Sequence, residues 1–351
     1  MLDFTLPDLT SWELLTKDRL PVVVYGMGNG ADLVFGELEK LNIPVAGVTA
    51  SDGFVRGQTF RGYKLKKLSE FDGEFRLVVA FGSSRPEVVD HIRSLGETRE
   101  IVVPTVPVCD SEVINRDFTL KYEKEINAVY NYLDEKSRKI YADCFRFMYS
   151  GDLAYLFGAV TDKDEIFGDY LKLGSSDAYL DLGAYKGDTV EEFLKYTGGR
   201  YSEITAVEAD KKNYDKLLSN TKKLTHFNAI NCAVSSADGK IAFSAAAGRQ
   251  SSVSVSGAVM QCRSVDSICR GKRVTYIKAD IEGSETAMLK GAFKTIKEQM
   301  PKMNIALYHR STDFFEIPMY FIKNFPGYSL AVRKHPGIPC WDMNLYCVPR
   351  N

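Results

Sequence analysis

Residues 178–188 have the sequence AYLDLGAYKGD, a short apolar run that leads into a turn built on glycine. The run predicts a buried strand with Asp181 near its carboxyl end, and an amphipathic helical pattern begins at residue 188. Gly183 and Gly187 lie between the two elements. Glycines in such a turn allow the backbone to approach a ligand that a Cβ atom would exclude. The segment therefore predicts a nucleotide-like ligand at the carboxyl edge of a parallel sheet.

A second strand is predicted just before Glu208. An acidic residue about 20 positions beyond the glycine turn is placed to accept hydrogen bonds from both hydroxyls of a ribose. Dinucleotides and S-adenosylmethionine (SAM) both fit this arrangement. The turn lacks the G-x-G-x-x-G pattern that cradles a pyrophosphate, and Asp181 suits a ligand with a positive ammonium and sulfonium. We therefore expect SAM as the cofactor.

The end of the chain supports the same interpretation. Residues 328–334 and 343–348 predict two strands, joined through Pro336, Gly337 and Pro339, which is a hairpin signal. A terminal antiparallel hairpin on a parallel sheet is typical of SAM-dependent methyltransferases, whereas an NAD-binding domain is purely parallel. The expected fold class is α/β, with a mostly parallel seven-stranded sheet that ends in an antiparallel hairpin.

Three side chains at this sheet edge are candidates for catalysis. Asp280 and Glu282 follow a predicted strand at residues 274–279, and His309 follows another at 303–308. Such carboxylates also cap helices, and a lone histidine is often a core or surface residue. A histidine at this edge can accept a proton near neutral pH, so we expect His309 as the base, with Asp280 or Glu282 as its orienting partner or substitute. Asp280 could instead face the cofactor amino group. The spacing of the three is not a recognised metal-ligand pattern, so no metal is expected.

A second strand and glycine turn occur near the N-terminus, in residues 21–30, PVVVYGMGNG. Alternating strands and helices predict a smaller Rossmann-like α/β domain there. The candidate second nucleotide site comprises Gly26, Gly28, Asn29, Asp52 and Gly82. A single G-x-G is a weak signal. The alternative is a Rossmann unit that binds no nucleotide and positions a partner or substrate.

Composition bounds the organisation of the 351 residues. We expect a Rossmann-like domain at 1–108, a helical bridge at 109–170 and a SAM-dependent methyltransferase domain at 171–351. A formal net charge of −1 argues against nucleic-acid binding, and the seven cysteines contain no CxxC pair. No apolar run approaches the length of a membrane span, and the N-terminus lacks the pattern of a signal peptide. We expect a soluble cytoplasmic protein that acts on a small molecule, with no membrane partner.

The chain contains, in order, the segments DLGAYKGDT, AVEAD, NCAVSSADGKIAF, RSVDSI, YIKADIEGSETAMLKGA and NIALYH. Over about residues 170–348 it resembles the FkbM-type SAM-dependent methyltransferases, whose turn usually has Asn where this chain has Tyr185. The resemblance implies O-methylation, often of sugar or polyketide hydroxyls. It also implies that Ala233 and Val234 lie near the adenine. The remaining cofactor positions that it implies are Asp181, Gly183, Ala184, Tyr185, Gly187, Glu208 and Asp280. The first domain resembles nucleotide-sugar-binding Rossmann domains that are fused to sugar-modifying transferases.

The function expected from the sequence is methyl transfer to a hydroxyl of a small molecule, such as a sugar, nucleotide-sugar or glycan precursor. Two alternatives stay open. One is an NAD(P)- or nucleotide-sugar-dependent oxidoreductase or epimerase that uses the N-terminal glycine turn, although the first domain offers no evident Tyr-x-x-x-Lys relay. The other is a non-catalytic module that binds SAM.

Overall fold

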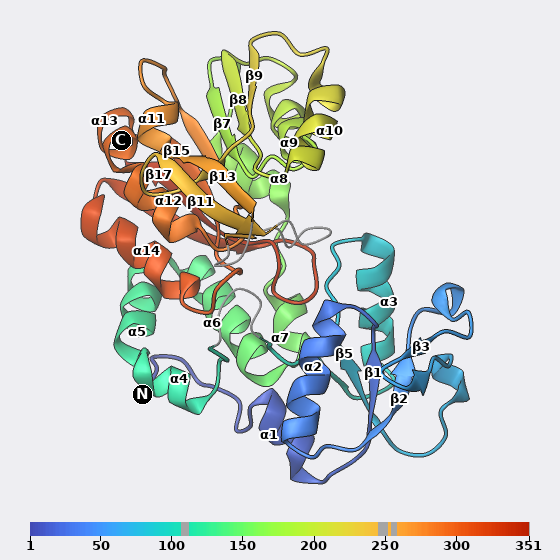
Figure 1. Cartoon of the computed structure of the whole chain (residues 1–351). Helices are drawn as coiled ribbons and strands as arrows, with labels where there is room; N and C mark the ends of the chain where they lie inside the picture. The colour runs from blue at the N-terminus through green and yellow to red at the C-terminus, as the bar shows by residue number, and fades with distance from the viewer. Residues whose placement is uncertain (107–111, 245–251, 254–257, 351) are drawn as a thin grey trace. The chain divides into compact units, whose positions relative to one another are not determined.

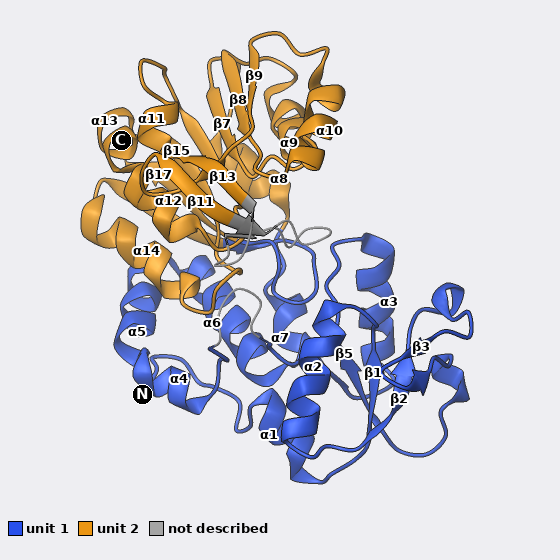
Figure 2. Ribbon diagram, in the orientation of Figure 1, with its two compact units in different colours: residues 1–161, 333–343 blue, residues 162–332, 344–351 orange. Residues whose placement is uncertain are grey.

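The computed structural model describes residues 1–106, 112–244, 252–253 and 258–350 (Figure 1). The chain forms two compact units, shown in different colours in Figure 2. Unit 1 comprises Met1–Thr161 and Arg333–Met343, and unit 2 comprises Asp162–Val332 and Asn344–Asn351. Among the described residues, no helix combines the length and apolar character needed to cross a lipid bilayer.

Unit 1 contains the expected smaller α/β fold. Its sheet has four strands in the order β2-β1-β5-β6, and β1 pairs in parallel with both β2 and β5. The strands and main helices are α1 (Ser11–Lys17), β1 (Val22–Tyr25), α2 (Asn29–Lys40), β2 (Val45–Thr49), β5 (Arg76–Val79), α3 (Pro86–Gly96) and β6 (Ile101–Val102). The connection from β2 to β5 contains η1 (Asp52–Phe54), β3 (Thr59–Phe60), β4 (Tyr63–Lys64) and η2 (Leu68–Glu70).

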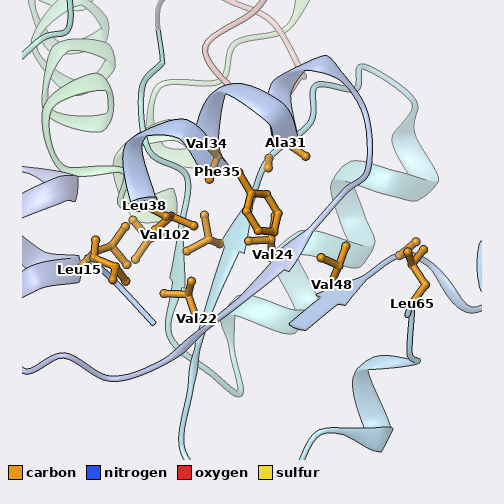
Figure 3. Close-up of a cluster of buried hydrophobic side chains, with 14 residues drawn as sticks. Leu15, Val22, Val24, Ala31, Val34, Phe35, Leu38, Val48, Leu65 and Val102 are labelled. Carbon is orange, nitrogen blue, oxygen red and sulfur yellow. The ribbon is translucent and has the colours of Figure 1, made fainter. Parts of the chain in front are cut away.

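The packing of α2 on this sheet follows from the sequence pattern. Apolar residues of α2 recur at spacings of three and four, at Ala31, Val34, Phe35 and Leu38, and all four are buried. They therefore share one helix face. Figure 3 shows this face against the apolar side chains of β1.

The helical segment expected after this sheet also belongs to unit 1. Its helices are α4 (Arg116–Lys121), α5 (Glu123–Tyr132), α6 (Glu135–Ser150) and α7 (Leu153–Gly158). Asp134 caps the start of α6 by accepting a hydrogen bond from the Ser137 backbone, and Gly151 ends this helix in the left-handed conformation. The expected boundary at residue 108 lies outside the described residues.

Unit 2 is built on a seven-stranded sheet in the order β16-β17-β15-β14-β7-β8-β9. The last strand of the chain, β17, lies between β15 and β16 and runs antiparallel to β15, whereas β14, β7, β8 and β9 pair in parallel. The expected mixed sheet is therefore confirmed. Its strands are β7 (Ala178–Leu182), β8 (Glu203–Val207), β9 (Phe227–Ile230), β14 (Tyr276–Ala279), β15 (Lys302–Ala306), β16 (Tyr328–Lys334) and β17 (Met343–Pro349).

Helices and a smaller sheet complete unit 2. The helices are α8 (Lys163–Glu165), the π-helical turn η3 (Ile166–Leu171), α9 (Asp188–Thr197), α10 (Lys211–Thr221), α11 (Val265–Ile268), α12 (Glu285–Gly291), α13 (Phe293–Gln299) and α14 (Asp313–Asn324). The smaller sheet has the order β10-β13-β11-β12 and contains β10 (Ala233–Val234), β11 (Gly239–Ser244), β12 (Ser252–Val253) and β13 (Ala258–Arg263).

The register of the large sheet aligns the ends of its central strands. Leu182 of β7 pairs with Val207 of β8 and with Ala279 of β14, and Ala279 pairs with Ile305 of β15. The residues that follow these strands therefore emerge at one carboxyl edge, where open α/β sheets bind their ligands.

The connection between β16 and β17 belongs to unit 1. Ser83 and Ile338 exchange two backbone hydrogen bonds, with N···O distances of 2.7 and 2.9 Å. The indole of Trp341 lies beside Gly82, where a Cβ atom would come within 2.3 Å of the ring. The hairpin signal in the sequence is confirmed, but it gave no indication that this connection packs against the end of β5.

Candidate active site

The glycine turn after β7 lies in close contact with the ends of two neighbouring strands, β14 and β8. Gly183 has φ of +83°, and a Cβ atom there would lie 1.9 Å from the carbonyl oxygen of Asp280. The Gly183 N–H also donates to the carbonyl of Val207 at 3.0 Å. Gly187, at φ of +97°, is the N-cap of α9. Backbone from three neighbouring strands thus meets at this turn, so Gly183 cannot be replaced without moving the backbone.

Tyr185 adopts a conformation that suits asparagine better. Its φ is +48°, in the left-handed region that residues with a Cβ atom rarely adopt and that Asn tolerates. The Tyr185 N–H donates to Glu208 Oε2 at 2.8 Å, so the conformation also aims a backbone donor at that carboxylate.

Glu208 lies just after β8, where the sequence predicts the ribose-binding acid. Its two carboxylate oxygens accept hydrogen bonds from the backbone N–H groups of Tyr185 and Asp210, each at 2.8 Å. The residue is 8% exposed. Burial raises the pKa of Glu208 to about 7, and these two hydrogen bonds oppose the rise. The backbone therefore fixes the orientation of this carboxylate.

Asp181 is fully buried beneath the turn. Its Oδ2 accepts a hydrogen bond from the Thr189 hydroxyl of α9, and Oδ1 makes no hydrogen bond with the described residues. Burial raises the pKa of Asp181 to about 6, against the opposing charge of Lys278. A buried acceptor without a donor is costly. Together with Glu208, it fits a ligand that brings ammonium and hydroxyl donors, as SAM does.

His309 lies in a buried cluster of carboxylates. Its Nδ1 is 2.8 Å from Glu285 Oε1, and its Nε2 is 3.3 Å from Asp280 Oδ1 and 3.6 Å from Glu282 Oε2. Burial lowers the pKa of His309, but the charges of Glu285, Asp280 and Glu282 outweigh it and raise the pKa to about 10. This charge environment favours the protonated imidazole, which donates hydrogen bonds. The sequence predicts His309 as the base, and that role stays a prediction.

Asp280 and Glu282 are the accessible members of the cluster. Their side chains are 33% and 30% exposed, whereas that of His309 is 4% exposed. Asp280 also accepts hydrogen bonds from the Tyr308 hydroxyl at 2.9 Å and Lys278 Nζ at 3.3 Å. Burial raises the pKa of Asp280, but the charges of Lys278 and His309 prevail and lower it to about 2.

Glu282 adopts φ of +53°, a strained conformation for a residue with a Cβ atom. Such strain persists only where the surrounding structure enforces it, and it is common at functional sites. The strain is thus located at one of the two exposed carboxylates.

The sequence analysis did not single out the residues beneath this cluster. Glu285 Oε1 accepts a hydrogen bond from the Ile281 N–H at 2.8 Å, and the same oxygen lies 2.8 Å from His309 Nδ1. Burial, together with the charge of Glu285, raises the pKa of Asp313 to about 8. The sequence did indicate that Lys278 could lie beside Asp280, because the two are two residues apart and alternate residues of a strand share a face.

Asp280, Glu285 and His309 are the described residues that could hold a metal ion, since each offers one ligand atom and these atoms lie within 4.8 Å of one another. The positive charge of His309 already accounts for the proximity of the two carboxylates.

The other expected cofactor residues are placed as follows. Ala184 is fully buried in the turn. Ala233 and Val234 form β10 of the smaller sheet, where Ala233 pairs with Cys262, and both are 5% exposed.

The residues of the candidate second site have different surroundings. A Cβ atom at Gly26 would lie 3.2 Å from the Phe81 ring, and the space beside Gly82 is filled by Trp341. Asn29 begins α2, and Gly28, its N-cap, has open space beside it. Asp52 lines a cavity to which none of these four residues contributes.

The sheet order, the glycine turn and the acid after β8 define the class: unit 2 is a SAM-dependent methyltransferase. Residues 181–330 match the family model described as the methyltransferase FkbM domain. The chain therefore carries an FkbM methyltransferase domain.

A solved structure shares this fold. The methyltransferase FkbM from Methylobacillus flagellatus KT is 20% identical, with a TM-score of 0.72, over 98% of this chain and 94% of that chain. Fibrillarin from Aeropyrum pernix, solved with natively bound SAM, is 14% identical with a TM-score of 0.34, over 50% of this chain and 67% of that chain. No curated protein matches the sequence.

Proposed function

We propose that the protein transfers a methyl group from SAM to a hydroxyl of a small molecule, in particular a sugar or a glycan precursor. The observation that carries the proposal is the pair of partly exposed carboxylates, Asp280 and Glu282, beside the buried imidazole of His309. The Asp280 backbone touches the glycine turn at Gly183, so the pair lies next to the expected cofactor position.

Bound SAM would supply the electrophilic methyl group, with Asp181 and Glu208 holding its amino acid and ribose parts. The remaining work belongs to the protein. Asp280 and Glu282 accept hydrogen bonds from the acceptor hydroxyl and orient its oxygen, and one of them takes the proton as the C–O bond forms. Such positioning lowers a barrier by about 7–11 kcal/mol, and a general base contributes about 10²–10⁴-fold.

His309 acts behind these carboxylates. Its Nε2 forms ion pairs with Asp280 and Glu282, while Glu285 fixes its ring through Nδ1. The imidazolium thereby holds two like charges together and keeps both oxygens aimed at the acceptor. His309 is thus a positioning residue in this mechanism.

The full-length protein incubated with SAM and a panel of hydroxyl-bearing sugars, nucleotide-sugars and small acids tests the proposal. Mass spectrometry should find a product heavier by one methylene unit, with an equal amount of S-adenosylhomocysteine. Tight binding of S-adenosylhomocysteine without any methylated product would indicate a binding module. Binding of NADH in its place would support an oxidoreductase.

A further inference from the structure

Unit 1 contains a cavity of about 610 Å³ that methyl transfer in unit 2 does not use. It lies where β1 and β2 end, and the other wall is formed by α3. Its volume is within the usual range for small-molecule sites. The polar and charged residues that matter for its chemistry are Tyr25, Ser51, Asp52, Arg85, His91 and Arg99.

The N-terminal glycine turn is not part of this cavity, because its glycines have packing roles. A Cβ atom at Gly30 would lie 2.6 Å from the carbonyl oxygen of Ala80, so this glycine lets α2 approach the end of β5. Trp341 fills the space beside Gly82. Gly26, Gly30 and Gly82 therefore lie against other parts of unit 1, and the hollow lies beside α3.

One wall of the cavity is apolar and aromatic. Phe54, Leu68, Val88 and Leu95 line it together with the ring of Tyr25. Tyr25 also meets His91 edge to face, with ring centroids 6.4 Å apart. A flat aromatic base gains free energy against such a surface by burial and by ring contacts.

The polar groups of the cavity suit the ribose and the phosphate of a nucleotide. Asp52 follows β2, the position at which doubly wound domains bind a ribose diol, and its side chain is 70% exposed. Its cationic neighbour Lys67 is 3.9 Å away, so the carboxylate oxygens keep accepting capacity.

Arg99 contributes a guanidinium group to the lining of the cavity. This group lies 5.6 Å from the centre of the Phe75 ring. Phosphate oxygens are strong acceptors for guanidinium groups. Arg85, at the start of α3, adds a second positive charge on the lining, although it also pairs with Glu87.

We propose that this cavity binds a nucleoside phosphate, with the base against the apolar wall, the ribose hydroxyls at Asp52 and the phosphate at Arg99. The site is independent of the methyltransferase site, so either proposal can fail without the other.

Calorimetry on the full-length protein tests the proposal, with excess S-adenosylhomocysteine present so that adenine nucleotides cannot use the site in unit 2. UDP, CDP, ADP and GDP are titrated, and the nucleotide that binds best is compared with its 2′-deoxy form. Loss of the 2′-hydroxyl should weaken binding about tenfold, and Asp52→Asn should abolish this discrimination. Arg99→Gln should weaken binding about 10- to 100-fold.

Filling the hollow provides a test that does not depend on these polar groups. Val88→Trp projects a ring into the cavity from α3 and should abolish binding, whereas Asp90→Trp, on the same helix but outside the lining, should leave it unchanged. Gly28→Ala should also leave it unchanged, because nothing lies within 4 Å of the added methyl group.

Unchanged hydrogen exchange in peptides that cover β1, β2 and α3 shows that unit 1 is folded in each variant. The proposal is overturned if none of the four nucleotides binds at about 1 mM, a weak-affinity limit. It is also overturned if Val88→Trp binds like the wild type, or if Gly28→Ala weakens binding as much as Val88→Trp.

Discussion

Gly183 and Gly28 are a matched pair, because each lies in the turn between a first strand and its helix. Gly183→Ala places a methyl group in the left-handed region, which costs about 1–2 kcal/mol. The same methyl group would lie 1.9 Å from the Asp280 carbonyl oxygen, so strand β14 has to move. Overpacking of this kind costs about 1–3 kcal/mol. The expected loss of stability in unit 2 is therefore about 2–5 kcal/mol.

Gly28→Ala should behave in the opposite way. Its φ is −125°, which any residue adopts, and the methyl group meets no atom within 4 Å. The change removes conformational freedom from the unfolded chain and should be neutral or stabilise unit 1 by up to about 1 kcal/mol.

Hydrogen exchange read by mass spectrometry resolves the two units separately. Gly183→Ala should increase exchange in peptides that cover β7 and β14 and should weaken S-adenosylhomocysteine binding at least tenfold, with unit 1 unaffected. Wild-type exchange and affinity in Gly183→Ala would refute the account of this turn. Equal damage from Gly28→Ala would show that glycine in such turns is required for some reason other than close backbone contact.

Three further predictions concern the same site. Tyr185→Asn should stabilise unit 2 by about 1 kcal/mol in thermal unfolding, since Asn tolerates the left-handed backbone; destabilisation would mean that the Tyr ring makes a contact of greater value. Burial raises the folded-state pKa of Glu208 to about 7, so its contribution to the stability of the free protein is present below pH 4.5 and is lost as the pH rises through 7. Ribose hydroxyls donate to the charged form of Glu208, so the affinity for S-adenosylhomocysteine should fall below pH 7. Calorimetry at pH 6 in two buffers should detect proton release on binding. An affinity that does not depend on pH would contradict this role. His309→Gln should lower kcat at least tenfold while the dissociation constant of S-adenosylhomocysteine changes less than threefold; restoration of a normal rate by added imidazole would be expected, and a loss confined to cofactor binding would exclude the positioning role.

The parts of the fold that sequence patterns predict are those governed by local periodicity. The strand that contains Asp181 and the strand before Glu208 are each followed by a recognisable helix. Their parallel pairing and common edge therefore follow from right-handed crossovers. The same reasoning predicts Asp280 and His309 at this edge. In the structure His309 Nε2 lies 3.3 Å from Asp280 Oδ1.

The remaining features depend on contacts between distant residues. Glu285 lies on a helix. The sequence does not reveal that its carboxylate contacts His309 in addition to the backbone N–H at the start of that helix. The raised pKa of His309 results from three carboxylates that converge on it, so it could not be predicted from the identity of this residue alone. Trp341 and Gly82 are far apart in sequence, so the sequence does not reveal that the indole lies beside this glycine.

The placement of Arg333–Met343 in unit 1 has a consequence for how the protein is made. Domains generally fold as units, beginning with the N-terminal one during translation. Here unit 1 stays incomplete until residues 333–343 have been synthesised, which is after most of unit 2. Any expression strategy that separates the first 161 residues from the hairpin deprives that unit of one of its own segments.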